Sequence, residues 1–209
     1  TPKDFENEAR KLGINNTSCI VVYDDHGVYS SPRVWWLFRT MGYTNIAVLD
    51  GGFPAWKKAN YPIEKKQIQD VELGNFKASF EPEKLIDSEI VLESVKNRSK
   101  QVVDARSKGR FNATEPEPRK EIRSGHIPTS TNLPFSSLLN NTELKSKEDL
   151  EQLFKEVNPD SKEMIFSCGS GITACVLALG ASIAGYKEMA VYDGSWTEWG
   201  SLTHLPIEK

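Results

Sequence analysis

The chain has 209 residues, and at roughly 150 residues per domain this length predicts one large domain or two small ones. Hydrophobic residues make up 38% and charged residues 26% of the chain, a composition that favours a folded core and excludes a disordered tail. The net charge of −3, with no apolar run near the roughly 20 residues that cross a bilayer, argues against nucleic-acid and membrane partners.

The first part of the chain predicts two strands on either side of a helix. The apolar run from Cys19 to Tyr23 predicts a buried strand. Pro32 suits the first turn of a helix, and Gly42 is a natural C-terminal stop for it. The run Ile46–Leu49 predicts the next strand, and the polar stretch that follows, over residues 65–81, predicts a linker.

The second part alternates strands with helices. The apolar runs predict strands over 101–104, 163–167 and 190–192, and helices over 90–97, 147–157 and 172–184. This alternation is typical of an α/β domain with a parallel sheet. Residues 106–126 are too polar and too rich in proline for a long element, and a loop of this length in a compact domain is usually functional or disordered.

An internal repeat relates the two parts. Residues 46–53 (IAVLDGGF) resemble residues 189–196 (MAVYDGSW), an offset of 143, and the same offset relates Trp56 to Trp199. We therefore predict two α/β domains with parallel sheets flanked by helices, over residues 1–64 and 82–209. Subtracting 143 from the second copy's strand at 101–104 gives positions before residue 1, so we expect the first copy to be incomplete and to leave apolar surface uncovered.

The segment with the strongest chemical signal is Cys168-Gly169-Ser170-Gly171-Ile172-Thr173, between a predicted strand and a buried helix. Ligands bind beyond the carboxyl ends of such strands. The two glycines allow consecutive backbone amides to turn inward, and these amides together with the helix N-terminus favour an anion. A cysteine at this position is biased towards the thiolate and hence towards nucleophilic attack.

The other cysteines are expected to be inert. Cys19 opens a strand, and Cys175 lies inside an apolar helix, where a thiol behaves as a small hydrophobic group. Three cysteines cannot form a disulfide framework, and none has a partner at zinc-finger spacing, so we expect a reducing compartment and no metal or other cofactor. The offset of 143 places Asp25 opposite Cys168, so the first copy is predicted to be structural or to form a wall of the active site.

The tandem halves, the single cysteine loop and the motif Asp-Gly-Ser-Trp-x-Glu-Trp at 193–199 resemble the rhodanese-type sulfurtransferases. The cysteine loop is similar to that of the 3-mercaptopyruvate sulfurtransferase branch, and so are residues 109–119 (GRFNATEPEPR) and 29–36 (YSSPRVWW). The resemblance implies two rhodanese-like domains, of which the offset of 143 predicts the N-terminal one to be incomplete. From the cysteine usage we expect a protein of the cytoplasm, with the mitochondrion as the alternative.

The resemblance also implies a mechanism. The Cys168 thiolate attacks the sulfur of 3-mercaptopyruvate, pyruvate leaves as its enolate, and the sulfur remains on Cys168 as a persulfide beside the amides of Gly169, Gly171, Ile172 and Thr173. Thioredoxin or a small thiol then accepts the sulfur, and reduction releases hydrogen sulfide.

Three polar side chains receive roles from the same resemblance. Arg110 and Arg119 match two arginines that bind the substrate's carboxylate and carbonyl, and a planar guanidinium suits a carboxylate because it donates two parallel hydrogen bonds. Ser170 resembles a loop serine that relays protons with a histidine and an aspartate of the first domain. The motif that carries this pair would precede residue 1, and loss of one proton-transfer group typically lowers a rate by ~10²–10⁴.

Three other functions compete with this one. Thiosulfate sulfurtransferases carry basic residues after the cysteine for a dianionic substrate, whereas Gly169 and Ser170 are neutral. A phosphatase of the rhodanese-like type needs an arginine six residues after the cysteine, and Ala174 stands there. The incomplete first copy leaves a third alternative, a catalytically weak sulfur carrier or interaction module.

Overall fold

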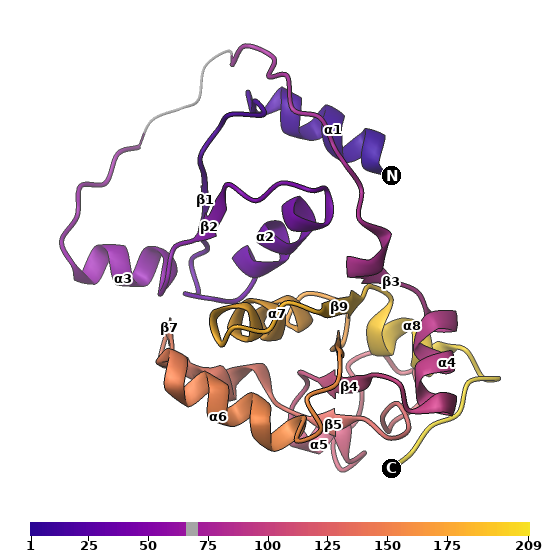
Figure 1. Ribbon diagram of the computed structural model, residues 1–209. Coiled ribbons are helices and arrows are strands. Elements are labelled where there is room, and N and C mark those ends of the chain that lie inside the picture. Colours follow the sequence, from indigo (N-terminus) through magenta and orange to yellow (C-terminus); the bar gives the residue numbers. More distant parts are fainter. Residues whose placement is uncertain (66–70) are drawn as a thin grey trace.

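The computed structural model describes residues 1–65 and 71–209 (Figure 1). Part of the predicted linker, residues 66–70, lies outside the described residues. In chain order the elements are α1 (Pro2–Lys11), β1 (Ile20–Val22), α2 (Ser31–Thr40), β2 (Ile46–Val48), α3 (Gly52–Lys58), the short helix η1 (Pro82–Lys84), β3 (Leu85–Ile86), α4 (Ser88–Asn97), β4 (Gln101–Asp104), α5 (Lys108–Phe111), β5 (Thr131–Asn132), the short helix η2 (Phe135–Leu138), β6 (Leu139–Asn140), β7 (Glu143–Leu144), α6 (Lys147–Val157), β8 (Met164–Ser167), α7 (Ala174–Ile183), β9 (Met189–Tyr192) and α8 (Ser195–Ser201).

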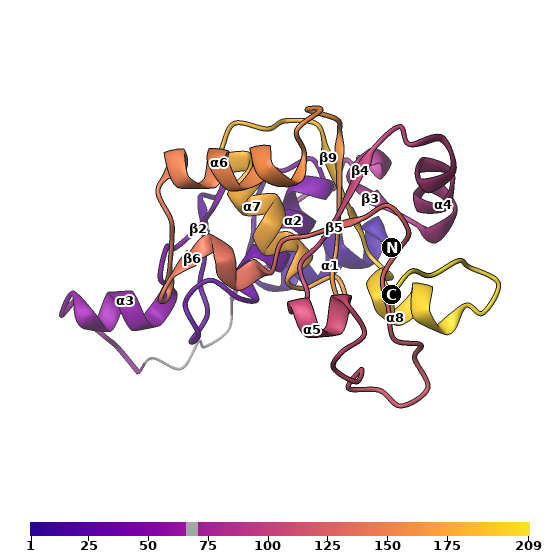
Figure 2. The same ribbon diagram turned by 90° about the horizontal axis from the view of Figure 1, so that it is seen from below.

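The second part contains a five-stranded sheet in the order β3-β9-β8-β4-β5, with every pairing parallel. The central strand β8 is buried along its whole length. Its Met164 and Phe166 belong to the core that includes α6 and α7, whereas Ile165 belongs to the core with Trp196 and Trp199 of α8. Helices thus cover both faces of the sheet (Figures 1 and 2), which confirms the predicted α/β class.

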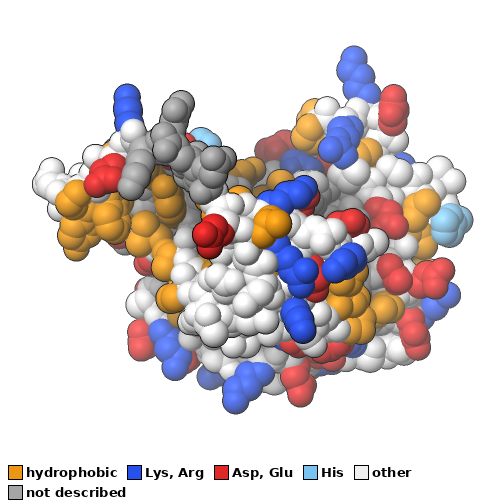
Figure 3. Space-filling model, turned by 90° about the horizontal axis from the view of Figure 1, so that it is seen from above, with side chains coloured by type: hydrophobic (Ala, Val, Ile, Leu, Met, Phe, Trp, Pro, Cys, Tyr) orange, Lys and Arg blue, Asp and Glu red, His pale blue; other side chains and the backbone are white. Residues whose placement is uncertain are grey.

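The first part contributes a two-stranded parallel sheet, β1-β2. Helix α2 packs against α7, and the buried residues of both helices form one continuous core. A strand forms at Ile20–Val22 within the predicted run 19–23, but the prediction that it is buried was wrong, because Val21 is 56% and Tyr23 60% exposed. Within the described residues β1 pairs only with β2, so its apolar side chains lack the cover that β8 has. Hydrophobic side chains gather over this end of the molecule, which carries α3 (Figure 3).

Strand pairing corrects the register of the repeat. Ile20 pairs with Ile46 in the first copy, and Met164 pairs with Met189 in the second. The offset is therefore 143 for β2 and β9 but 144 for β1 and β8. The residue that corresponds to Cys168 is consequently Asp24, and the prediction of Asp25 was wrong. From Ile20 to the start of α2 at Ser31 the chain is one residue longer than from Met164 to the start of α7 at Ala174, and this insertion restores the offset of 143 in the helices.

The described part of the predicted linker, residues 71–81, is not free in solvent. It runs in extended form along α1 and α2, where the Phe76 ring is fully buried against Phe5 and Phe38.

Domain boundaries at 64 and 82 remain a prediction. Within the described ranges, the helices are too short or too polar to cross a membrane.

Candidate active site

Cys168 follows directly after β8, at the carboxyl end of the central strand, and is 1% exposed. Its backbone is fixed by the start of α8. The Cys168 N–H donates to Oγ of Ser195 at 3.1 Å, and its carbonyl accepts from the N–H of Trp196 at 2.9 Å. The next carbonyl, of Gly169, accepts from the N–H of Thr197 at 3.0 Å. These hydrogen bonds fix the backbone of the cysteine at the carboxyl edge of the sheet.

The loop after Cys168 offers unpaired backbone donors. Among the described residues, the amides of residues 169–173 have no hydrogen-bond acceptor, and α7 begins without a side-chain N-cap. Gly171 takes a φ of +76°, a left-handed conformation that glycine adopts without steric cost. Unpaired amides at a glycine-rich turn that leads into a helix form an anion site. The loop is therefore equipped to stabilise a thiolate or a persulfide.

The first copy shows what such a loop binds. Oδ2 of Asp24, at the position equivalent to Cys168, accepts the backbone N–H groups of Tyr29, Ser30 and Ser31 at 3.0, 2.9 and 2.9 Å. Burial alone would raise the pKa of Asp24, but the hydrogen bonds from Ser31, Tyr29 and His26 outweigh it and lower this pKa. A negative charge at this position is thus favoured by the fold itself.

A pocket of about 320 Å³ opens beside Cys168. Its lining includes every residue predicted for the site except Gly171 and Arg119. The lining residues are Tyr29, Ala105, Arg106, Ser107, Arg110, Phe135, Cys168, Gly169, Ser170, Ile172 and Thr173.

The two predicted arginines occupy different places. The Arg110 guanidinium lies against the cysteine loop, where a Cβ atom added to Gly169 would be 3.1 Å from its Nη2. Glu117, whose side chain is 3% exposed, accepts from Nη2 of Arg110 at 2.6 Å. Arg119 is exposed and reaches the loop only indirectly, because its Nη1 donates to Oγ1 of Thr197 at 3.0 Å and this hydroxyl donates to the Gly169 carbonyl at 2.6 Å.

The first part of the chain supplies a wall and a support. Tyr29 lines the pocket, and its ring lies 5.6 Å from that of Phe135. Arg33 pairs with Oδ1 of Asp193 at 2.5 Å, and its Nη1 lies 3.5 Å from the carbonyl of Gly171. The predicted role of the first copy as a wall therefore has a structural basis in α2 and the loop before it.

Other titratable groups near the loop are structural. The Cys175 thiol donates to the Gly171 carbonyl at 3.2 Å, and burial raises its pKa to about 12, so it stays protonated at neutral pH. His126 stacks on Phe111 with ring centroids 3.9 Å apart. Arg106 pairs with Asp104 at 2.7 Å, and this buried ion pair joins the end of β4 to the start of the polar loop.

Sequence reasoning assigned no role to several side chains that shape the site. Glu117 and Arg33 stand inside motifs that carry the family resemblance, so their positions were visible but their contacts were not. Thr197 and Ser195 belong to α8, and only the folded chain brings this helix to the cysteine loop.

Comparison with known proteins identifies the class to which this fold and cysteine loop belong. The profile of the rhodanese-like domain matches residues 1–59 and 88–202, and the chain belongs to this family. The 3-mercaptopyruvate sulfurtransferase of Mus musculus is 46% identical over 199 residues, which are 93% of this chain and 67% of that protein. The mitochondrial thiosulfate/3-mercaptopyruvate sulfurtransferase 1 of Arabidopsis thaliana is 40% identical over 230 aligned residues, covering 100% of this chain and 61% of that protein.

Solved structures agree with this assignment. The crystal structure of SseA from Escherichia coli, described as a 3-mercaptopyruvate sulfotransferase with the rhodanese fold, superposes with a TM-score of 0.83. It is 34% identical, over 94% of this chain and 73% of that one. The chain thus spans about two thirds of the length of the relatives it matches.

Proposed function

We propose that this chain transfers sulfur from 3-mercaptopyruvate to a thiol acceptor through a persulfide on Cys168. The observation that carries the proposal is the placement of Cys168 at the base of a pocket, beside unpaired loop amides and the Arg110 guanidinium. Its close relatives are 3-mercaptopyruvate sulfurtransferases, which makes this substrate the first to test.

The reaction has two half-steps. In the first, the Cys168 thiolate attacks the substrate sulfur, the carbon–sulfur bond breaks, and its electron pair leaves with pyruvate as the enolate, which takes up a proton. Arg110, at the pocket wall, holds the substrate carboxylate, and the amides of residues 169–173 stabilise the negative charge on sulfur. Ser170 lines the same pocket, where its hydroxyl can pass a proton to the enolate.

The second half-step regenerates the enzyme. An acceptor thiolate, from thioredoxin or a small thiol, attacks the outer sulfur of the persulfide, and the sulfur–sulfur bond breaks to return the Cys168 thiolate. The acceptor carries the sulfur away, and a further thiol can release it as hydrogen sulfide. Arg119 lies at the exposed side of the loop, where it can meet the substrate's carbonyl as it enters.

Mass spectrometry of the intact protein tests the proposal. Incubation with 3-mercaptopyruvate should add one sulfur atom to the wild-type chain and to Cys19→Ser, and none to Cys168→Ser. Absence of the adduct in the wild-type chain, or its presence in Cys168→Ser, would refute the proposal. Faster loading from thiosulfate than from 3-mercaptopyruvate would favour the thiosulfate sulfurtransferase instead.

Location is part of the same proposal. We infer a cytoplasmic protein. The mitochondrion is the alternative, because the name of one relative describes it as mitochondrial. Fractionation of cells that produce the natural protein decides between the two compartments.

A further inference from the structure

The position of Arg110 depends on a buried carboxylate. Oε2 of Glu117 accepts from Nη2 of Arg110 at 2.6 Å, and Oε1 accepts from Nε at 3.3 Å. This two-point contact fixes the plane of the guanidinium, which carries five N–H donors in a rigid fork. With Nε and one Nη2 donor occupied by Glu117, the donors on Nη1 and the second one on Nη2 remain for an anion in the pocket.

Glu117 is also held by a buried arginine, Arg106. Nη1 of Arg106 donates to Oε1 of Glu117 at 2.8 Å, while its Nε and Nη2 donate to Asp104 at 2.9 and 2.7 Å. The Arg106 side chain is 0% exposed and lies over the Trp196 ring at 4.4 Å. Because neither Arg106 nor Asp104 can turn away, Glu117 has a rigid support.

The four side chains form a charge chain that leads from the end of β4 to the pocket. Asp104, Arg106, Glu117 and Arg110 alternate in sign, and their formal charges cancel. In a partly buried site each charge acts through a dielectric far below that of water. An arginine already paired with a carboxylate therefore attracts a second negative charge less strongly than an unpaired one does.

We propose that Glu117 is a positioning residue that also determines which donor charge the pocket accepts. It holds Arg110 beside Gly169 and cancels one positive charge, which favours a donor with a single carboxylate, such as a mercapto-2-oxo acid, over a dianionic donor such as thiosulfate. This inference rests on the proposed function, because it assigns the selectivity of the same pocket.

Steady-state kinetics with both donors provides the first test. Glu117→Gln keeps the size of the side chain and removes its charge, so kcat/KM for 3-mercaptopyruvate should fall roughly 10- to 100-fold, mainly through KM, as is typical when a charged hydrogen-bonded pair is broken. The value for thiosulfate should fall less or rise. Glu121→Gln, at an exposed glutamate of the same loop, should match the wild type. Equal losses for both donors would overturn the inference, since a merely structural role predicts that result.

Glu117→Asp keeps the charge but shortens the side chain. This variant should lower kcat/KM for both donors by similar factors and so preserve the wild-type preference between them. If Glu117→Gln does not unfold cooperatively and is therefore misfolded, Glu117→Asp provides the kinetic test instead. A shift of preference towards thiosulfate in Glu117→Asp would contradict the charge argument.

A third measurement does not depend on turnover. The Arg110 Nε–H signal, assigned by its loss in Arg110→Lys, should be shifted in ¹⁵N NMR spectra of Glu117→Gln relative to the wild type, because its acceptor has changed. An unchanged signal would overturn the positioning role. If the wild-type chain takes up no sulfur at all, the proposed function fails, and this signal still decides whether Glu117 positions Arg110.

Discussion

Replacing Gly171 with alanine tests whether the cysteine loop needs glycine for its shape or also for its close packing. The residue has a φ of +76°, and a left-handed conformation costs an L-residue ~1–2 kcal/mol. A new Cβ would also lie 2.9 Å from the Asp193 carbonyl oxygen and 3.3 Å from Nη1 of Arg33. Crowding of this kind typically costs a further ~1–3 kcal/mol, so Gly171→Ala should lower the free energy of unfolding by about 2–5 kcal/mol.

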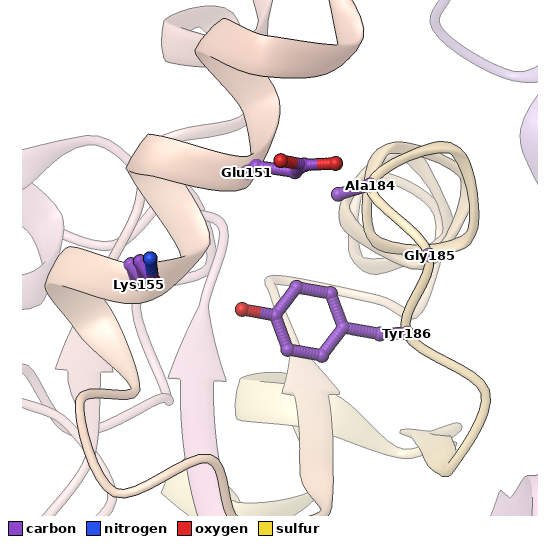
Figure 4. Close-up of a pocket in the computed structure, with 5 residues that line it drawn as sticks. All are labelled: Glu151, Lys155, Ala184, Gly185 and Tyr186. Atoms are coloured by element: carbon purple, nitrogen blue, oxygen red, sulfur yellow. The ribbon is translucent and has the colours of Figure 1, made fainter.

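Gly185→Ala is a matched control for the backbone contribution. Gly185 has a φ of +94°, and a Cβ built on it meets no heavy atom within 4 Å. The residue borders an open hollow between α6 and the end of α7 (Figure 4), which leaves room for a methyl group. This variant should therefore lose only the backbone contribution of ~1–2 kcal/mol.

Urea unfolding followed by tryptophan fluorescence measures both losses. At a slope of ~1–3 kcal/mol per molar urea, the midpoints of the two variants should differ by on the order of 1 M, with Gly171→Ala lower. Gly171→Ala should also slow sulfur loading of Cys168, because the loop must move away from Asp193 to admit the methyl group. Equal midpoints for the two variants would show that the contacts of Gly171 are not restrictive, and would refute the reasoning.

Three further outcomes are expected. Ile165→Ala should lower the free energy of unfolding by about 2–5 kcal/mol in urea, whereas Val21→Ala at the equivalent strand position should lower it by less than about 1 kcal/mol, because Val21 is already 56% exposed; similar losses would contradict this. Arg33→Gln removes the ion pair that supports the cysteine loop from the first part and should slow sulfur loading about tenfold; a wild-type rate would show that the support is dispensable. Iodoacetamide at about pH 8 should alkylate the exposed Cys19 and spare Cys175, as peptide mass mapping can verify, because burial raises the pKa of Cys175 to about 12. Since that pKa lies above the ordinary value of 9.0, the protonated thiol contributes stability that is complete below 9.0 and is lost as the pH rises towards 12.

The elements with strong periodicity or long apolar runs were predictable. The structure has a helix at Lys147–Val157 and a strand at Gln101–Asp104, as the patterns predict, and the buried helix predicted over 172–184 appears as Ala174–Ile183. The first helix, Pro2–Lys11, was missed because it is mostly polar and presents only Phe5 and Ala9 as large or buried apolar side chains to the core. Its signal was the capping box formed by Thr1 and Asp4, a local pattern that propensity alone does not reveal.

The candidate site also has a part that the local sequence predicts and a part that only the folded chain reveals. A cysteine between a strand and a buried helix is a local feature of the sequence. Residues 169–173 follow it directly, so they were predicted together with it. The contact of Glu117 with Arg106 and Arg110 depends on how the long polar loop folds back, and no periodicity encodes that path. The approach of Arg33 to Gly171 joins residues 138 positions apart and exists only after α2 packs on α7.

The two copies separate what the fold supplies from what the chemistry requires. In both, a strand ends at a loop that leads into a helix, and the loop amides favour a negative charge beside the strand end. Asp24 fills that position permanently with a carboxylate, which holds its amides by hydrogen bonds and leaves nothing to react. In the proposed reaction Cys168 supplies charge as a thiolate or a persulfide, and among the described residues the amides of its loop are unpaired. Under the proposed function, a catalytic and a structural copy share one strand–loop–helix design and differ in the side chain at the strand end and in the length of the loop that follows it.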